Sequence, residues 1–173
     1  PGQALRELAR WAHFYNPPLI KLHPGLHHYP VTGRNYRAIW DYANQTEAVV
    51  LVHTWDSDPT CGPSLFPGLA KACPRAQILL GHSGVTWRGY HQAIEAAESA
   101  SNLYLDLSGS QNHRLILERA VERLGSERIL FGSDLPYLEA SMTLARVLTA
   151  RISDSAKENI LRKNFLRLAR EKA

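Results

Sequence analysis

Two histidines and an aspartate in this sequence each follow directly on a short apolar run. AVVLV precedes His53, QILLG precedes His82, and ILFGS precedes Asp134. Imidazole nitrogens and carboxylate oxygens are ligand atoms that zinc and similar divalent metals take in proteins. A bound metal ion lowers the pKa of a coordinated water, and a carboxylate beside it can accept the proton as that water attacks. The three residues therefore indicate a site for metal-assisted hydrolysis.

Each of these residues also has a structural explanation. A single histidine at the end of a strand more often makes a structural hydrogen bond than binds a ligand. Asp134 lies shortly before Pro136 and could start a turn or cap a helix. The placement of all three residues at the ends of apolar runs favours one shared function over three separate structural roles.

The elements that would position these residues have the pattern of a parallel sheet. Five β-like runs occupy residues 19–23, 48–53, 77–82, 102–108 and 128–134. Segments with helical periodicity, each polar on one side, lie between runs at 35–46, 88–100 and 113–125. Continuous apolar runs are typical of parallel strands that helices cover, so the sequence predicts an α/β fold. The carboxyl ends of parallel strands form a common binding face, where the three residues are expected to meet.

Further polar side chains are expected at the same edge of the sheet. Lys21 and His23 share one face of the first run, because side chains alternate along a strand. Trp55 follows the second run in a loop that can line a pocket. Asp106 lies inside the fourth run, where it is expected either to join the site or to hydrogen-bond a neighbour.

The composition fits one domain over residues 1–173. With 45% hydrophobic residues, a chain of this length can bury a sizeable core. The net charge of +4 is modest and Lys and Arg are scattered, which argues against nucleic acid as a partner. No run approaches the roughly 18 apolar residues of a membrane span. At the chain ends, helices are expected over residues 3–15 and after an N-cap at Ser153.

The two cysteines, Cys61 and Cys73, have no C-x-x-C partner. This spacing argues against a disulfide framework or a zinc knuckle and favours a reducing compartment, the cytoplasm. No predicted strand is followed by a G-x-G-x-x-G or P-loop pattern, so an open doubly wound sheet that binds an anion is the weaker alternative.

A series of motifs resembles a known family over nearly the whole chain. The motifs are IKLHP (20–24), LVHTW (51–55), LLGHSG (79–84), NLYLDLSG (102–109), RILFGSDLPY (128–137) and ENILRKNFLRL (158–168). In order and spacing they are similar to the second half of the amidohydrolase-related branch of the metal-dependent hydrolases. The resemblance implies a parallel (β/α)8 TIM-barrel-like fold, of which this chain carries strands four to eight.

The resemblance also implies roles for three strand-end residues. His53 matches the metal ligand of strand five. His82 matches the histidine of strand six, which either binds metal or polarises the substrate. Asp134 matches the aspartate of strand eight, which binds metal and takes a proton from the attacking water. His53, His82 and Asp134 are therefore the predicted metal ligands, and His82 and Asp134 are the predicted catalytic residues.

The substrate side of the site is implied in the same way. Lys21 matches the lysine of the K-x-H-P motif, and with His23 and Trp55 it is expected to contact a small-molecule substrate. The cofactor implied is a divalent metal ion, with zinc first and manganese or iron as alternatives.

The chain departs from the family pattern at its start. The first strand of the family carries an H-x-H pair of metal ligands, and this sequence contains no H-x-H. A barrel of this type has about 250 residues, so three N-terminal βα units are expected upstream. Metal affinity and catalytic activity of the chain by itself are expected to be low, and unpaired strand edges favour self-association.

Three functions remain open from the sequence. The first is a metal-dependent hydrolase that activates water to cleave C–N or C–O bonds in small molecules. The second is a metal-dependent, non-oxidative decarboxylase of the same family, which uses the same ligands. The third is a non-catalytic barrel fragment or interaction module that has lost its metal centre.

Overall fold

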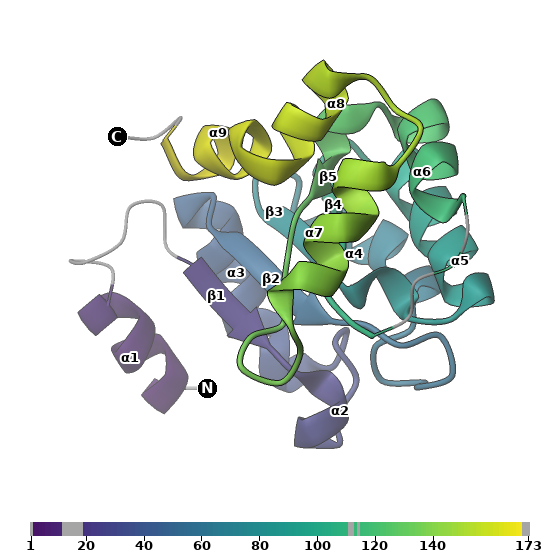
Figure 1. Ribbon diagram of the computed structural model, residues 1–173. Coiled ribbons are helices and arrows are strands. Elements are labelled where there is room, and N and C mark those ends of the chain that lie inside the picture. Colours follow the sequence, from purple (N-terminus) through teal and green to yellow (C-terminus); the bar gives the residue numbers. More distant parts are fainter. Residues whose placement is uncertain (1, 12–18, 111–112, 114, 171–173) are drawn as a thin grey trace.

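Five parallel strands form the centre of the computed structural model, which describes residues 2–11, 19–110, 113 and 115–170 (Figure 1). The strands are β1 (Leu19–Leu22), β2 (Val49–His53), β3 (Gln77–Gly81), β4 (Leu103–Asp106) and β5 (Ile129–Leu130). Each strand pairs in parallel with the next along the chain, in the order β1-β2-β3-β4-β5. The predicted α/β fold with a parallel sheet is confirmed.

Helices connect successive strands, and three more α-helices of the described residues come after the last strand in the chain. The α-helices are α1 (Gly2–Trp11), α2 (Pro24–His27), α3 (Arg37–Thr46), α4 (Phe66–Ala72), α5 (Trp87–Glu98), α6 (Ile116–Leu124), α7 (Ala140–Thr149), α8 (Asp154–Glu158) and α9 (Asn164–Arg170). Helices α3, α5 and α6 correspond to the three segments predicted between strands. The third segment was predicted to begin at His113, but α6 begins at Ile116, and His113 instead bonds the carbonyl of Val85 through Nε2 at 3.2 Å.

The helices at the chain ends follow the predictions in part. Helix α1 covers most of the predicted N-terminal helix, and residues 12–18 lie outside the described residues. Ser153 is an N-cap, because its hydroxyl accepts a hydrogen bond from the backbone N–H of Ala156 at 3.2 Å. The segment after it is not one regular helix, since a π-helical turn, Asn159–Lys163, separates α8 from α9. Helix α9 lies at the end of the sheet where the strands begin (Figure 1).

The fifth strand is shorter than the predicted run of residues 128–134. Strand β5 contains Ile129 and Leu130, and the chain then leaves the sheet, because the N–H of Phe131 donates to the carbonyl of Ile160 at 2.9 Å. Phe131 packs against the main core. The predicted extent was wrong because the apolar character of Phe131 reflects packing rather than strand pairing.

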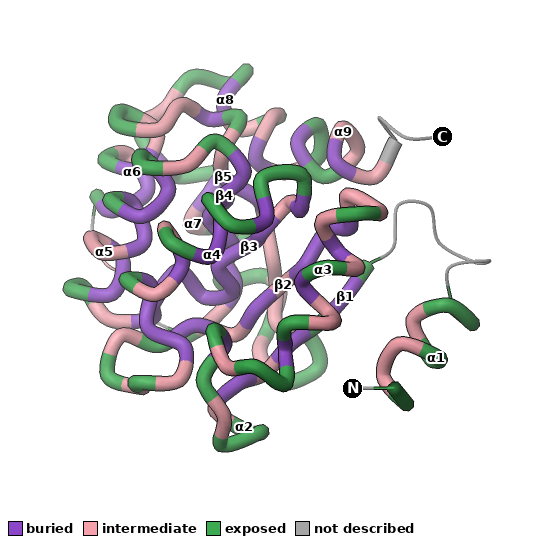
Figure 2. Tube along the Cα trace, turned by 180° about the vertical axis from the view of Figure 1, so that it is seen from behind, coloured by how far each residue is buried: buried purple, intermediate pink, exposed green. Residues whose placement is uncertain are grey.

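Alternation along the strands gives the sheet two unlike faces. On the outer face, which the connecting helices cover, the strand residues of the main core are Ile20, Leu22, Val50, Val52, Ile78, Leu80, Leu103, Leu105 and Ile129. On the inner face, a smaller cluster packs against Leu168 of α9 and contains Val49, Leu79, Tyr104 and Leu130. Figure 2 shows buried residues along the strands and exposed residues gathered on peripheral helices such as α1 and α2.

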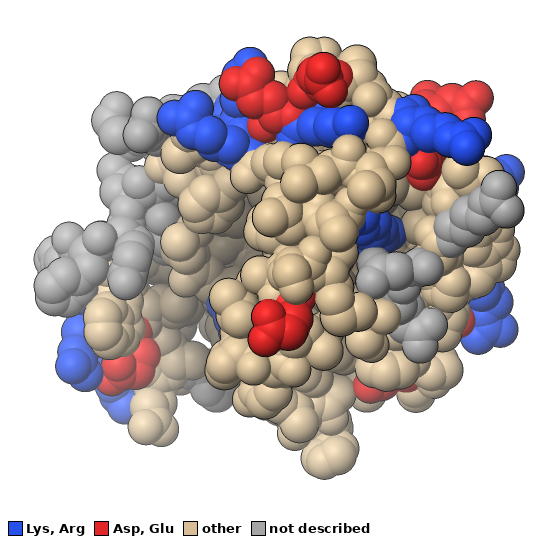
Figure 3. All heavy atoms as spheres, in the orientation of Figure 1, with Lys and Arg blue, Asp and Glu red and all other residues tan. Residues whose placement is uncertain are grey.

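Charged side chains of both signs are interspersed on the surface. Lys157 pairs with Asp154 at 3.7 Å, and Lys163 pairs with Glu158 at 2.8 Å. Figure 3 shows blue and red side chains next to one another over this part of the chain. None of the helices that the structure describes is both long and apolar enough to span a membrane.

Candidate active site

Strand ends bring ionisable side chains together at one edge of the inner face. His53 ends β2, in register with Gly81 of β3, and Asp106 ends β4. Lys21 in β1 and His23 directly after this strand lie on the same face, because side chains alternate. We call this edge, at the carboxyl ends of the strands, the mouth.

Imidazole rings lie against one another at the mouth. The rings of His23 and His53 are stacked, with centroids 3.9 Å apart and an angle of 13° between the ring planes. His82, which follows β3, meets the ring of His53 edge-on at a centroid distance of 4.8 Å. The indole of Trp55 lies 6.2 Å from the His53 ring. The structure therefore brings the two predicted metal-binding histidines together and adds His23 as a third ring.

Burial and neighbouring positive charge keep His53 neutral. Burial lowers the pKa of His53 to about 4, and positive charge on His23, His82 and Lys21 acts in the same direction. The ordinary pKa of a histidine is near 6.5. At neutral pH the ring of His53 therefore carries no charge and offers a lone pair.

Lys21 in the first strand, β1, interacts with carboxylates from the strands farthest from it in the sheet. Burial lowers the pKa of Lys21 from its ordinary value, while the charges of Asp106 and Asp134 oppose this shift. The three groups are therefore close enough to interact electrostatically, although they come from β1, β4 and the segment after β5. Lys21 supplies positive charge to the inner face at the mouth.

Asp134 begins a turn and also reaches the mouth. Its carbonyl accepts hydrogen bonds from the N–H groups of Tyr137 at 3.0 Å and Leu138 at 3.3 Å, and its φ is 63°. Asp tolerates this left-handed conformation better than most residues. The turn-forming alternative for Asp134 is thus confirmed for its backbone, while its carboxylate interacts with Lys21.

The described residues do not assemble a complete metal site. Among them, no group of three or more His, Cys, Asp and Glu side chains is arranged to hold a metal ion. His53 and His82 supply two adjacent imidazoles, but Asp134 does not complete a ligand group with them. A metal ion at the mouth would need donors beyond those that these residues bring together.

Asp106 has a larger part in the mouth than its sequence position indicates. It accepts hydrogen bonds from the backbone N–H of His82 at 3.1 Å and from the hydroxyl of Ser108, both at Oδ2. Burial raises the pKa of Asp106, and these hydrogen bonds oppose the shift. The sequence signal was the spacing of Asp106 and Ser108, which places both side chains on one face of an extended segment.

A left-handed turn aims His82 at the mouth. His82, Ser83, Gly84 and Val85 all have positive φ, from 46° to 80°. Such backbone conformations are costly for residues other than glycine and persist where neighbours hold them. Here the Thr54 hydroxyl donates to the Gly81 carbonyl at 2.7 Å and accepts from the Gly84 N–H at 2.8 Å. The position of His82 is therefore set by several strand ends at once.

The chain has recognisable relatives. The profile of the amidohydrolase family matches residues 1–168. This chain belongs to the amidohydrolase family. The family resemblance of the motifs is thereby confirmed, although no curated protein sequence matches the chain.

Solved structures of low sequence identity share the fold of this amidohydrolase-family chain. An uncharacterized TIM-barrel protein from Bordetella bronchiseptica is 20% identical with a TM-score of 0.74, over 87% of this chain and 56% of that one. The 5-carboxyvanillate decarboxylase from Sphingomonas paucimobilis is 20% identical with a TM-score of 0.70, over 96% and 62%. A dihydroxybenzoic acid decarboxylase from a Polaromonas species, with bound manganese and 2-nitroresorcinol, is 18% identical with a TM-score of 0.62, over 83% and 56%.

The chain spans 56–62% of the length of these three relatives. Its sheet has the fold of part of a TIM barrel, as predicted. The family consists of metal-dependent enzymes, and the manganese in the Polaromonas decarboxylase is one example. The mouth described above lies where barrels of this class place their active sites, at the carboxyl ends of the strands.

Proposed function

We propose that this chain carries the strand-end part of a metal-dependent hydrolase that cleaves C–N or C–O bonds in small, carboxylated molecules. One observation carries the proposal: the rings of His23, His53 and His82 meet beside Lys21 at the carboxyl ends of neighbouring strands. Family membership supports this reading, because amidohydrolases use that end of the barrel.

The residues of the mouth have separate proposed roles. His53 and His82 are the proposed metal ligands, and Asp134 is the proposed third ligand, although the described residues do not group it with them and further donors would be needed. A bound metal would supply Lewis-acid chemistry. Asp134 accepts the proton of the attacking water. Lys21 binds a substrate carboxylate through its ammonium group. His23 stacks on His53 and fixes the orientation of that ring.

The proposal also covers a substrate contact by Trp55, the identity of the metal and the location of the protein. Trp55, which is 40% exposed, offers an indole face to a small-molecule substrate near the His53 ring. Zinc is the first candidate for the metal, and manganese and iron also suit imidazole and carboxylate ligands. Two buried, free cysteines, Cys61 and Cys73, suit a reducing compartment, and we propose a cytoplasmic location.

A decarboxylase is the second candidate. The Sphingomonas and Polaromonas structures with similar folds are both decarboxylases, and the latter contains manganese and an aromatic inhibitor. The same mouth suits this reaction, because Lys21 can hold the carboxylate that leaves. Hydrolysis and decarboxylation differ in their products, so they can be separated by experiment.

Metal binding tests the assignment of the mouth. Titration of the purified protein with Mn²⁺ and with Zn²⁺, followed by calorimetry, is expected to show binding that His53→Gln and His82→Gln each weaken at least tenfold, the scale of a lost metal interaction. His91→Gln is the matched control, because His91 lies on α5 and away from the mouth. Binding that survives both mouth substitutions, or that His91→Gln weakens equally, would contradict the proposal.

Product analysis tests the reaction. The metal-loaded protein is incubated with aromatic carboxylates, lactones and cyclic amides, and carbon dioxide and hydrolysis products are measured separately. Hydrolysis that Asp134→Asn abolishes supports the first candidate. Carbon dioxide release without hydrolysis replaces the first candidate with the second.

A further inference from the structure

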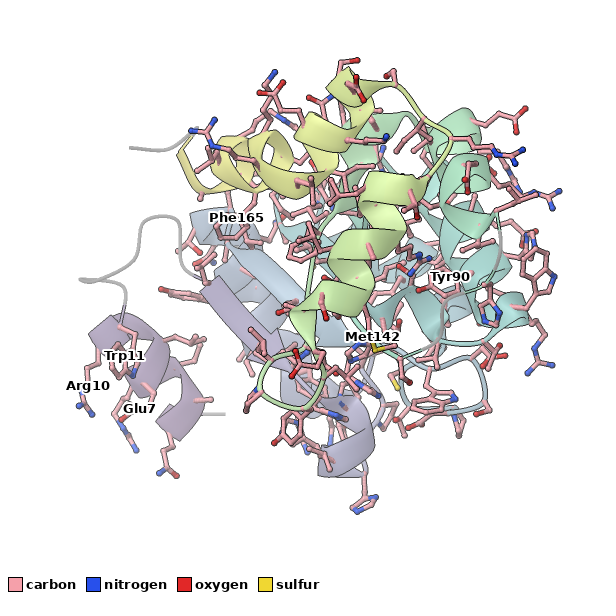
Figure 4. The ribbon with its side chains drawn as sticks, viewed as in Figure 1. Glu7, Arg10, Trp11, Tyr90, Met142 and Phe165 are labelled. Carbon is pink, nitrogen blue, oxygen red and sulfur yellow. The ribbon has the colours of Figure 1, made fainter. Side chains whose placement is uncertain are left out.

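Arg146 in α7 is a half-buried cation that the described residues satisfy only in part. Its Nη1 donates a hydrogen bond to the hydroxyl of Tyr90 at 3.0 Å, and its guanidinium carbon lies 5.1 Å from the centre of the Tyr90 ring (Figure 4). Nε and Nη2 are buried, and among the described residues neither atom has a hydrogen-bond partner. No ion pair within this part of the chain includes Arg146. Two nitrogens of the guanidinium therefore lack an acceptor there.

A buried cation without a negative partner is costly. Charged groups lose the solvation of water on burial, so buried guanidinium groups are generally paired with a negatively charged acceptor. Tyr90, which is 2% exposed, compensates for this loss in part through its ring and its hydroxyl. Its contacts leave the N–H groups of Nε and Nη2 unused. A negatively charged acceptor at these two atoms would therefore stabilise the protein.

Other arginines of the protein show which acceptor fits these two atoms. Nε and Nη2 of Arg123 in α6 donate to the two oxygens of the Glu98 carboxylate, and Nε lies 2.6 Å from Oε1. Nε and Nη2 of Arg75 both donate to Oε1 of Glu47. The N–H bonds of Nε and Nη2 point in the same direction, which matches the spacing of carboxylate oxygens. The same pair of atoms on Arg146 is therefore suited to a carboxylate.

A cavity of about 310 Å³ lies beside Arg146, between α6 and α7. Figure 3 shows a hollow beside α7 with Lys or Arg atoms set back in it. Apolar side chains from both helices line the cavity, among them Leu117, Met142 and Ala145. Its size is at the lower end of the range for cavities that hold small molecules. We propose that this cavity binds a small monocarboxylate, whose carboxylate pairs with Nε and Nη2 of Arg146 and whose apolar part contacts Leu117 and Met142.

The carboxylate reaches the two nitrogens after a change of side-chain rotamer, because neither atom is accessible to solvent. Arg146 and Met142 both line the cavity, and both have long side chains with several rotatable bonds. Met142 is 46% exposed, so its side chain has room to move. The pair then forms away from bulk water, where a charge-assisted hydrogen bond is stronger than at the surface.

Glu118 limits the charge of the ligand. It also lines the cavity, and its Oε1 accepts the backbone N–H of Arg151 at 3.0 Å. No ion pair between Glu118 and Arg146 is formed by these described residues. A negative charge on Glu118 repels anions, and it repels a phosphate with two charges more than a carboxylate with one. A monocarboxylate therefore fits the cavity better than a phosphate does.

The cavity is separate from the mouth and goes beyond the proposed function. Tyr90, Leu117 and Val147, which surround Arg146 on its own and neighbouring helices, belong to the main core on the outer face of the sheet. Among the described residues, none of the mouth residues Lys21, His23, His53, His82 and Asp134 lines the cavity.

Nuclear magnetic resonance of the full chain tests the proposal with benzoate as the probe. In protein labelled with ¹⁵N-arginine, the Nε–H signal of Arg146 is identified by its loss in Arg146→Lys. Benzoate is expected to shift this signal until the site is saturated. Benzamide, which has the same shape without the charge, and inorganic phosphate are expected to bind at least tenfold more weakly. No saturable shift with benzoate, or equal binding of benzamide or phosphate, would overturn the proposal.

Variants on two sides of the cavity locate the binding. Arg146→Lys keeps the charge but loses the paired N–H groups, and Ala145→Leu fills the cavity with Arg146 in place. Each is expected to weaken benzoate binding at least tenfold, measured by saturation transfer to benzoate, which is the scale of lost hydrogen bonds to a charged group. Arg37→Lys is the matched control, because the Arg37 side chain in α3 is 83% exposed. Binding that survives both cavity substitutions, or that Arg37→Lys weakens equally, would contradict the site.

Lys21→Gln separates this site from the mouth, where a substrate carboxylate is also proposed to bind. Lys21→Gln is expected to leave the titration of the Arg146 signal unchanged. Benzoate binding that Lys21→Gln weakens and Arg146→Lys does not would place the carboxylate at the mouth, which overturns the cavity site and supports the proposed function. Binding that depends on Arg146, in a protein without metal binding or turnover, keeps the cavity site and removes the proposed function.

Discussion

The two faces of the sheet differ in how completely they are covered. On the outer face, Leu80 and its neighbours are fully buried under the connecting helices. On the inner face, Leu19 and Phe165 are each 46% exposed, and a cavity of about 230 Å³ lies between the start of the sheet and α9. Figure 4 shows Phe165 over this end of the sheet. The outer face therefore carries most of the apolar packing, and the inner face leaves side chains accessible.

The inner face also changes character along the strands. At the start of the strands it is apolar, with Val49 and Leu130 packed against Leu168. At the mouth it carries Lys21 and His53, and burial lowers the pKa of both side chains, which disfavours their protonated, charged forms. Close groups of equal charge reduce stability, so this edge is suited to binding rather than to holding the fold.

The largest expected effect contrasts an outer with an inner leucine. Leu80→Ala removes a fully buried side chain and is expected to lower the free energy of unfolding by about 2–5 kcal/mol. Leu51→Ala, on the neighbouring strand and the partly buried inner face, is expected to cost about 1 kcal/mol. Urea unfolding measures both. Equal costs would show that the inner face is as tightly packed as the outer face.

The stability of the protein as a function of pH tests whether His53 at the mouth is buried in its neutral form. Below pH 6.5 the unfolded chain binds a proton at His53, whereas the folded protein does so only near pH 4. The contribution of neutral His53 to stability is therefore fully present above pH 6.5 and is lost as the pH falls towards 4. The difference in pKa corresponds to a loss of at most about 3 kcal/mol.

The control for the pH series is His53→Gln, which removes the titrating group. Between pH 6.5 and 4, the unmodified protein is expected to lose more stability in urea unfolding than this variant. Parallel pH profiles of the two proteins would show that His53 is not buried enough to resist protonation.

The sequence predicted the outer face better than the mouth. Apolar runs and their spacing predicted the strands, because burial on an outer face requires residues such as Val50 and Leu80 at alternate positions. It predicted that His53 and His82 would be neighbours, because parallel strands end at the same edge. It predicted neither the stacking of His23 on His53 nor the left-handed turn, because both depend on side chains from different strands that fix one another.

The smallest expected effects compare two glycines, one at the mouth and one in the helical layer. In Gly132→Ala the new methyl group would lie 2.1 Å from Oδ1 of Asp106, and we expect a loss of about 1–3 kcal/mol in the free energy of unfolding. In Gly68→Ala, within α4, nothing lies within 4 Å of the new methyl group. This substitution is expected to raise the free energy of unfolding by about 0.5–1 kcal/mol, because alanine favours the helix.

If Gly132→Ala lowers the free energy of unfolding and Gly68→Ala raises it, the backbone at the mouth is more tightly packed against its neighbours than the backbone of α4. Asp106 cannot turn away from a methyl group on residue 132 without breaking its hydrogen bonds to His82 and Ser108. If Gly132→Ala leaves the free energy of unfolding unchanged, the carboxylate of Asp106 can adopt another orientation, and the backbone after β5 does not restrict it. A loss confined to Gly132→Ala would mean that the mouth tolerates an added methyl group less well than the helical layer does.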